Sequence, residues 1–502
     1  MSSGSRVNQF TVPKLSTPQF WRRCVLISLV LPFFAVESAA AGEPGSRPNI
    51  VLILLDNIGQ EWFGCYGSEE KCTPNIDRIA AEGVRFSNCY APPVCSPSRV
   101  QLLTGRYPFR TGWFLHHDAA FYRGGGFDWK REVSVARVLR DAGYVTGMAG
   151  KWQVNHLYDE PDAIRQHGFQ ESLVWPGSVE HLDDDPTKRA RFEQAIREND
   201  STYLREATRE VESRYWDPVV MKDGRREVLK GKFGPDEFQK FAFDFMARHR
   251  NRPFFFYHSV VLAHRTGHGV NTTPENKDNP PVDERAAFAG LVQYADRQVA
   301  ELIAELDRLG LRDNTIVLIA SDNGTERSIS GGRNGLTVKG GIYSVSEAGG
   351  NVTLVVNSPK LVPGKRVASL CDFSDVFPTL CAFARAPIPA GLTLDGRSQA
   401  EYLLAKAEPP RKWIFNQYRP DRVVRDARYK LYSDGRFFDA NADWLEQRPI
   451  APGADPVADE ARRQLQAVLN SLPPDVPAPF LHRSISAFNQ RKAEGKKQTR
   501  LP

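Results

Sequence analysis

The sequence predicts a large α/β domain with a mostly parallel sheet sandwiched by helices, followed by a small antiparallel subdomain with a helix. Two continuously apolar runs, at residues 49–55 and 314–320, are typical of strands buried on both faces of a parallel sheet. Between them, segments with helical and strand periodicity alternate. After about residue 386 the pattern changes to short alternating strands. We therefore expect an α/β domain over residues 45–385 and a subdomain over residues 386–480.

The composition is that of a folded globular protein. The chain has 502 residues, with 66 Lys and Arg against 60 Asp and Glu, and 41% of its residues are hydrophobic. These values exclude disordered, collagen-like and coiled-coil chains. The net charge of +6 falls to +3 without the first 41 residues, which hold four basic and one acidic side chain. This balance does not indicate a nucleic-acid partner.

The N-terminal residues have the layout of an export signal. Two arginines precede an apolar run at residues 24–36, and small residues follow at 38–41. The run is interrupted by Pro32 and is shorter than the roughly 20 residues that span a bilayer. We expect a signal peptide over residues 1–41, no stable membrane span, and a periplasmic or secreted protein.

The elements of the α/β domain follow from periodicity and from glycines that end helices. Residues 171–250 are charged and aromatic, without clean strands, and we expect a helical and loop insertion over one edge of the sheet. Other segments read as helices at 74–82, 133–142 and 283–309, and as strands at 145–149 and 253–257.

The C-terminal subdomain is predicted from four short alternating segments and one amphipathic segment. Turn sequences such as Asp434-Gly435 separate the strands. A basic tail at residues 481–502 reads as a solvated chain end. The predicted strands are 413–418, 422–426, 429–432 and 437–439, and the predicted helix is 459–470.

The same dipeptide follows both buried apolar runs. Asp56-Asn57 ends the first and Asp322-Asn323 ends the second. Taken singly, most such dipeptides are turns or helix caps. Open α/β sheets, however, bind ligands at the carboxyl ends of their strands. Two pairs at such positions favour a metal site, since carboxylate and amide oxygens are the ligands of a hard cation.

The most informative motif is Cys95-Ser96-Pro97-Ser98-Arg99, followed by an apolar stretch and Thr104-Gly105-Arg106. It places a thiol at the start of a predicted helix, where free backbone N–H groups favour an anion, and an arginine one turn later. A structural thiol with a helix-surface arginine is the alternative. The length and spacing of the motif favour a nucleophile.

This motif resembles the signature of the type I sulfatases, C-x-P-S-R followed by a helix and T-G-R. The resemblance implies an alkaline phosphatase-like fold and hydrolysis of a sulfate ester, with sulfated polysaccharides or their fragments as substrates. It also implies that Cys95 is oxidised to formylglycine (3-oxoalanine) by a formylglycine-generating enzyme. Further segments similar to family landmarks are 48–57, 65–67, 73–77, 147–152, 253–257 with His264, 321–324 and 346–350.

The family pattern also implies roles for individual residues. Arg99 would help the metal to lower the pKa of the hydrated aldehyde, whose oxygen attacks sulfur. Lys151 would hold the sulfate oxygens, and His264 would protonate the leaving alcohol. The implied ligands of Ca²⁺, or of Mg²⁺, are Asp56, Asn57, the modified residue 95, Asp322 and Asn323.

The chain departs from the family pattern at three positions. Asn57 stands where most members have a second aspartate. Gln153 stands where they have a histidine that can transfer a proton, and we expect Gln153 to bind the substrate by hydrogen bonds instead. Ile342 replaces a lysine, and Lys339 is expected to reach the sulfate instead. Three histidines could replace the missing one, although we expect surface or loop positions for them: His116, His117 and His156.

Two other functions remain open. A phosphonate monoester or phosphodiester hydrolase of the same superfamily would use the same signature. A noncatalytic anion-binding relative would keep the site without turnover. Retention of Cys95, Arg99, Lys151 and His264 makes sulfate ester hydrolysis the leading hypothesis.

Overall fold

A computed structural model describes residues 47–118, 125–177, 185–198, 200, 202–203, 214–264, 272–360, 362–364 and 366–480. These residues belong to one compact unit. The predicted signal peptide and the basic tail lie outside the described residues. Within the described part of the chain, no helix combines the length and apolar character that crossing a bilayer requires.

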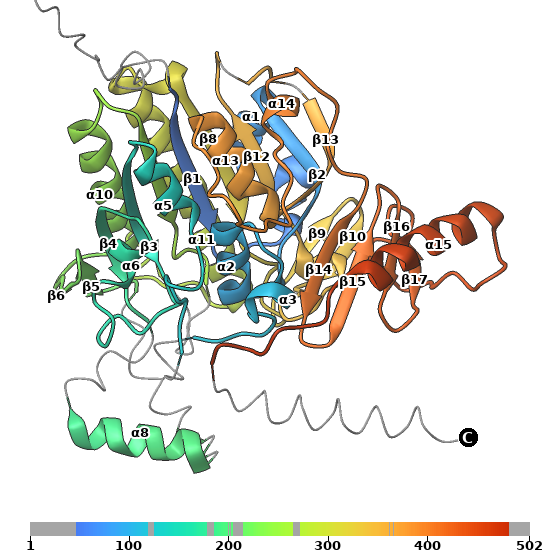
Figure 1. The fold of residues 1–502 in the computed structure, drawn as a ribbon. Coiled ribbons are helices and arrows are strands. Elements are labelled where there is room, and N and C mark those ends of the chain that lie inside the picture. Colours follow the sequence, from blue (N-terminus) through green and yellow to red (C-terminus); the bar gives the residue numbers. More distant parts are fainter. Residues whose placement is uncertain are drawn as a thin grey trace, which may run out of the picture. The chain divides into compact units, whose positions relative to one another are not determined.

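A large mixed sheet runs through the described part of the domain, as predicted (Figure 1). Its central strands β8, β1, β7, β3 and β4 are parallel, whereas β12 pairs antiparallel with both β8 and β2. In spatial order the strands are β11 (Asn351–Val352), β2 (Val84–Tyr90), β12 (Leu354–Asn357), β8 (Thr315–Ser321), β1 (Asn49–Leu55), β7 (Phe254–Ser259), β3 (Val145–Lys151), β4 (Glu171–Trp175), β5 (Val219–Lys222) and β6 (Arg225–Val228), with β13 (Arg366–Asp372) beside β2.

Alternation along β1 explains the two helical layers. Ile50, Leu52 and Leu54 belong to a core shared with helices α2 (Cys95–Thr104), α5 (Val135–Asp141) and α13 (Val376–Ala384). The intervening residues of β1 face a second core, which they share with α1 (Pro74–Glu82), α10 (Gly234–Arg248) and α11 (Glu284–Arg308). Every residue of β1 is therefore buried, as its continuous apolar run indicates.

The expectation for residues 171–250 was wrong in one respect. Three strands, β4, β5 and β6, extend the sheet there instead of a strand-free insertion. They are short, and the four residues of β6 are all exposed and mostly charged. Charged residues are common on edge strands because they discourage pairing with other chains. Such a strand lacks the apolar signal from which the buried strands were predicted.

The C-terminal subdomain has the predicted antiparallel sheet and helix. Its strands are β14 (Ile414–Tyr418), β15 (Asp421–Arg425), β16 (Tyr429–Tyr432) and β17 (Phe437–Asp439), and α15 (Pro456–Ser471) packs on them. The remaining described elements are η1 (Gln60–Trp62), η2 (Gly64–Tyr66), α3 (Pro108–Thr111), α6 (Ala163–Gln166), α8 (Pro186–Glu198), η3 (Arg312–Asn314), the hairpin β9 (Ser330–Arg333) and β10 (Leu336–Lys339), α12 (Glu347–Gly350), η4 (Phe373–Asp375) and α14 (Ala400–Leu403).

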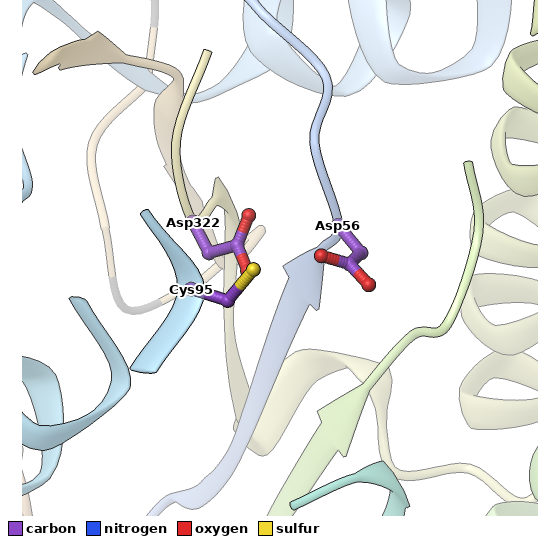
Figure 2. A group of neighbouring side chains, drawn as sticks. All are labelled: Asp56, Cys95 and Asp322. Carbon is purple, nitrogen blue, oxygen red and sulfur yellow. The ribbon is translucent and has the colours of Figure 1, made fainter. Parts of the chain in front are cut away.

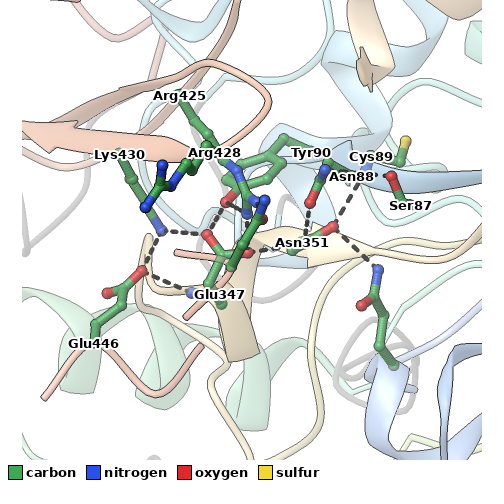
Figure 3. A network of polar contacts seen from close by, with 12 residues as sticks. Ser87, Asn88, Cys89, Tyr90, Glu347, Asn351, Arg425, Arg428, Lys430 and Glu446 are labelled. Atoms are coloured by element: carbon green, nitrogen blue, oxygen red, sulfur yellow. Dashed lines mark hydrogen bonds and ion pairs between the residues drawn. The ribbon is translucent and has the colours of Figure 1, made fainter. Parts of the chain in front are cut away.

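A buried polar network joins this subdomain to the large sheet (Figure 3). Glu347, at the start of α12, accepts hydrogen bonds from Arg425 at 2.5 Å and from Lys430 at 3.2 Å, both on the small sheet. Tyr90 on β2 and Asn351 on β11 also donate to it. All five side chains are buried, so the ionised groups compensate each other's charge within the protein.

Candidate active site

The two Asp-Asn pairs lie together at the carboxyl ends of neighbouring strands. Asp56 follows β1 and Asp322 follows β8, and these strands pair in parallel along their whole length. The backbone N–H of Asp322 donates to the carbonyl of Leu55 at 3.0 Å, and the N–H of Asn57 donates to Oδ1 of Asp322 at 3.0 Å. The sheet register therefore brings the two predicted pairs into direct contact.

Cys95 begins α2 and lies against both pairs. Its side chain is 2% exposed, and its Sγ lies 3.8 Å from Oδ1 of Asn57. One ligand atom each of Asp56, Cys95 and Asp322 lies within 4.8 Å of the others. Figure 2 shows Cys95 and Asp322 side by side, with Asp56 at the tip of β1. The structure thus brings the predicted nucleophile and the predicted metal ligands together.

Two buried cations neutralise the carboxylates. Nζ of Lys151, the last residue of β3, donates to both oxygens of Asp56 at 2.8 and 3.0 Å. Nη2 of Arg99 donates to Oδ2 of Asp322 at 2.7 Å, and its Nη1 donates to the carbonyl of Lys151 at 3.2 Å and to Ser259. Arg99 lies one turn into α2, as the motif predicts. These contacts fix both cations beside Cys95.

The charges shift the pKa values of the two carboxyls in opposite directions. Although burial alone would raise it, Lys151, with His264 and Arg99, holds the pKa of Asp56 below its usual range. Burial and the neighbouring Asp56 charge raise the pKa of Asp322 to about 6. Two carboxylates so close compete for ionisation, which favours a site for a bound cation.

The environment of Cys95 disfavours its thiolate. Burial raises its pKa to about 12, with Asp322 and Asp56 opposing the thiolate as well. The thiolate, rather than the thiol, is the nucleophile of cysteine chemistry. An unmodified Cys95 therefore has little nucleophilic character at neutral pH.

The amide side chains add oxygen donors to the carboxylates. Nδ2 of Asn323 donates to Oδ1 of Asn57 at 2.7 Å, and Oδ1 of Asn323 has no hydrogen-bond partner among the described residues. Both side chains are at most 1% exposed. An unsatisfied buried oxygen beside two carboxylates fits a hard cation such as Ca²⁺.

His264 is half-buried and lies close to the same carboxylate cluster. Its carbonyl accepts a hydrogen bond from the hydroxyl of Tyr215 at 2.8 Å. Its charge acts on Asp56 and contributes to lowering the pKa of that carboxyl. The structure therefore brings His264 near the site through the loop that follows β7.

Arg214 was missed by the sequence analysis. It is 1% exposed, its Nη1 lies 3.7 Å from Oδ2 of Asp56, and its guanidinium lies 3.8 Å above the ring of Trp175. It belongs to the charged and aromatic stretch that carried no motif. The Arg214-Tyr215-Trp216 run, with three residue types common at binding sites, was the available signal.

Gln153 is buried, whereas Lys339 is exposed. Gln153 is 3% exposed, and its Nε2 donates to Asp118 at 3.2 Å. Lys339 is exposed at the end of β10. None of the hydrogen bonds or ion pairs among the described residues joins Lys339 to Asp56, Lys151 or Asp322. That Lys339 binds sulfate therefore stays a prediction, since no contact among the described residues supports it.

The three alternative histidines were expected at surface or loop positions. His117 is fully buried and stacks on Phe480 with ring centroids 4.0 Å apart, and His156 is 5% exposed beside Asp159. Both lie in loops, as expected, but their side chains are buried rather than at the surface. His116 is partly buried, and its Nδ1 lies 3.3 Å from the hydroxyl of Ser96, the residue after Cys95.

A family model described as Sulfatase matches residues 48–386 of the chain. Among curated proteins, human arylsulfatase A is 32% identical over 411 residues, which cover 78% of this chain and 76% of that protein. The N-acetylgalactosamine-6-sulfatase of Canis lupus familiaris is 31% identical, with 73% of this chain and 68% of that protein covered. The match spans the α/β domain that carries the site.

Solved structures share the fold. The crystal structure of Ps i-CgsB in complex with k-i-k-neocarrahexaose matches with a TM-score of 0.70 and 23% sequence identity, covering 89% of this chain and 97% of that chain. The structure of BT4656 in complex with D-glucosamine-2-N,6-O-disulfate matches with a TM-score of 0.60 and 20% identity, covering 84% of this chain and 97% of that chain. The similarity extends into the C-terminal subdomain, since it covers more of the chain than the family model does.

Proposed function

The chain belongs to the sulfatase family, and we propose that it removes sulfate from a sulfated carbohydrate, with residue 95 as nucleophile after oxidation of its cysteine to formylglycine. The observation that carries this proposal is the buried cluster of Cys95, two carboxylates and the cations that hold them. Support for a carbohydrate comes from relatives named N-acetylgalactosamine-6-sulfatase and from structural neighbours in complex with sulfated or oligosaccharide ligands.

The balance of buried charge supports an anionic substrate. Arg99, Lys151 and Arg214 are three buried cations, whereas Asp56 and Asp322 are the two buried carboxylates that they contact. An uncompensated buried charge is costly, so a site with excess positive charge favours a bound anion. A sulfate ester carries one negative charge and three oxygens that accept hydrogen bonds from such donors.

Modification of Cys95 gives the site a nucleophile that the buried thiol does not provide. At 2% exposure, the side chain is inaccessible to another protein in the folded chain. We therefore expect a formylglycine-generating enzyme to act before folding is complete. Export through a signal peptide at residues 1–41, to the periplasm or the medium, is part of the same proposal.

A divalent cation, Ca²⁺ or Mg²⁺, would be held by the residue 95 oxygens together with Asp56, Asn57, Asp322 and Asn323. When bound, it would supply positive charge that stabilises an oxyanion. The carboxylate and amide oxygens already lie together, and Oδ1 of Asn323 has no partner among the described side chains.

The chain's own residues would divide the remaining work. Arg99 and Lys151 would hold the nucleophilic residue and the sulfate oxygens in line, and their buried positions would keep those donors ordered. His264 would donate the proton that the leaving alcohol needs as its oxygen separates from sulfur. Gln153 would bind the substrate by hydrogen bonds alone, since an amide does not transfer protons at neutral pH.

We also propose the division of the chain into a catalytic domain over residues 45–385, a subdomain over 386–480 and a basic tail over 481–502. The test of function begins with the mass of the tryptic peptide 86–99 from protein coexpressed with a formylglycine-generating enzyme. The aldehyde mass, together with sulfate release from sulfated oligosaccharides that Cys95→Ala abolishes, is the expected result.

Two other results would contradict the proposal. Phosphodiester or phosphonate monoester cleavage with a higher kcat/KM than sulfate release would point to the related hydrolases. An intact cysteine, in a host that converts a control sulfatase, together with binding but no turnover, would point to a noncatalytic relative.

A further inference from the structure

A group of aromatic and cationic side chains lies next to the nucleophile segment and has no part in the chemistry derived above. We call it the Tyr343 patch, and it comes from four separate stretches of the chain. Its members are His116, Arg327, Tyr343, Tyr418 and Arg419.

Two backbone and side-chain contacts tie the patch to the residues around Cys95. The N–H of Tyr343 donates to the carbonyl of Pro93 at 2.8 Å. Nδ1 of His116 lies 3.3 Å from the hydroxyl of Ser96. Because Pro93 and Ser96 flank Cys95 in the chain, the patch is held beside the proposed nucleophile.

The rings and guanidinium groups contact one another in sequence. The ring centroid of Tyr343 lies 6.2 Å from His116 and 6.0 Å from Tyr418. The guanidinium of Arg327 lies 5.8 Å from the Tyr343 centroid, and that of Arg419 lies 5.3 Å from the Tyr418 centroid. The charges of both arginines also act on Tyr418 and oppose the rise in its pKa that burial causes. The two cations therefore face the same aromatic surface.

Within the patch, Tyr343 presents the exposed ring, whereas Tyr418 is buried. The φ of Tyr343 is +68°, a left-handed value that is uncommon for an aromatic residue, and 37% of its surface is accessible to solvent. Backbone strain of this kind persists where the surrounding structure imposes it, and it is frequent at ligand sites. Arg419 shares the left-handed conformation, at φ +55°, in the two-residue turn between β14 and β15. Arg327 and Arg419 are both exposed.

We propose that the Tyr343 patch binds the part of an anionic oligosaccharide that lies beyond the sulfate to be removed. A flat aromatic ring offers a broad apolar surface to the C–H face of a sugar, and arginine forks bind sulfate or carboxylate groups on neighbouring sugars. The acidic side chains on the same elements are Glu326 and Asp421, and Asp421 already interacts with Arg436 and Arg419. This inference rests on the proposed function and extends it to substrate length and charge.

The test compares Arg327→Gln/Arg419→Gln with the unchanged chain on two substrates, a sulfated tetrasaccharide and an aryl sulfate. We expect the ratio of their kcat/KM values, tetrasaccharide over aryl sulfate, to fall by about tenfold or more, because two charge-assisted hydrogen bonds are lost. Tyr343→Ala should lower the same ratio. The matched control is Arg297→Gln, which removes an arginine that lies 4.3 Å from the ring of Tyr294 on α11.

A binding measurement separates failure of the patch from failure of the proposed function. The Cys95→Ala protein is titrated calorimetrically with the tetrasaccharide, with and without the two arginine substitutions. Weaker binding of the substituted protein supports the patch even if no substrate is hydrolysed. Equal affinities, or equal losses of kcat/KM on both substrates, would overturn it.

Discussion

The ammonium group of Lys151 lies 2.8 Å from Oδ2 of Asp56, and neither side chain is accessible to solvent. This ion pair neutralises one of the two carboxylates that flank Cys95, while Arg99 neutralises the other. Both pairs are thus satisfied within the chain. A divalent cation at Asp56 and Asp322 would release Lys151 and Arg99 to bind an incoming anion, which links metal binding to substrate binding.

The first prediction concerns the divalent cation proposed at Asp56 and Asp322. Calcium should raise the melting temperature of the protein, because a ligand that binds only the folded state stabilises it, by about 2.7 kcal/mol at 100 times Kd. Differential scanning fluorimetry with and without a chelator measures the shift. Asp322→Asn should lose most of it, whereas Asp434→Asn, at an exposed carboxylate paired with Arg436, should keep it. An undiminished shift in Asp322→Asn would place calcium elsewhere.

A second prediction concerns Gln153, which occupies the position of a proton-transferring histidine in the family pattern. Gln153→His should raise kcat, since a positioned imidazole contributes typically about 10²-fold or more to proton transfer. The gain should follow the titration of the introduced imidazole. The pH dependence of kcat measures it, with Gln153→Asn as the amide control. No gain at any pH would mean that proton transfer there does not limit turnover.

Arg214 provides the third prediction. Arg214→Gln should raise the inhibition constant for inorganic sulfate by about tenfold, the loss of one buried charge-assisted contact. Arg214→Lys should recover only part of the lost affinity for sulfate, because lysine keeps the charge but loses the planar stacking on Trp175. Competition kinetics on an aryl sulfate measure both. Unchanged sulfate inhibition with a lowered melting temperature would assign Arg214 a structural role only.

The part of the site that lies at the ends of buried strands and at the start of α2 was predicted from the sequence. The apolar runs of β1 and β8 located Asp56 and Asp322, and the motif at the start of α2 located Cys95. Lys339 shows the limit of that reasoning, because proximity in sequence to Ile342 does not determine direction. Successive residues of a strand point to opposite faces, and on β10 Val338 is the buried one, so Lys339 points to solvent.

Arg214 was missed for a different reason. Its place beside Asp56 depends on packing against Trp175, the last residue of β4, a strand that the hydrophobic pattern did not reveal. Contacts between segments far apart in the sequence carry no local periodicity. The same holds for Glu347, whose partners Arg425 and Lys430 lie on the small sheet.

The fourth prediction is that Glu347→Gln destabilises the protein by about 3 to 5 kcal/mol, since it leaves Arg425 and Lys430 buried with less compensation. Although burial alone would raise it, these two cations lower the pKa of Glu347 to about 2. The ion pair therefore contributes stability above pH 4.5, and this contribution is lost as pH falls from 4.5 through 2.

Urea unfolding at pH 7 measures the loss caused by Glu347→Gln. Glu460→Gln, on the exposed face of α15, is the matched control and should be nearly neutral. Adding Arg425→Gln to Glu347→Gln should cost less than the sum of the two single changes, because the partners are removed together. Additive losses would show that the two side chains do not act as a pair.

The last prediction concerns Glu61, a fully buried carboxyl to which Thr325 donates a hydrogen bond. Burial raises its pKa from 4.5 to about 7. The folded protein therefore holds this proton over a pH range in which the unfolded chain has lost it. The contribution of the Glu61 carboxyl to the free energy of unfolding is fully present below pH 4.5. It is lost as pH rises through 7, at about 1.4 kcal/mol per pH unit inside that window.

Glu61→Gln removes this dependence, because the amide stays neutral at every pH. Compared with the unchanged chain, the variant should gain relative stability between pH 5 and pH 8, by about 3 kcal/mol over the whole window. The difference between the two proteins is the quantity to measure, by urea unfolding at several pH values. Burial lowers the pKa of His258 and of His167 to about 4, so both titrate in an overlapping range, but they do so equally in the two proteins and cancel. A difference that does not change with pH would show that Glu61 is ionised in the folded state.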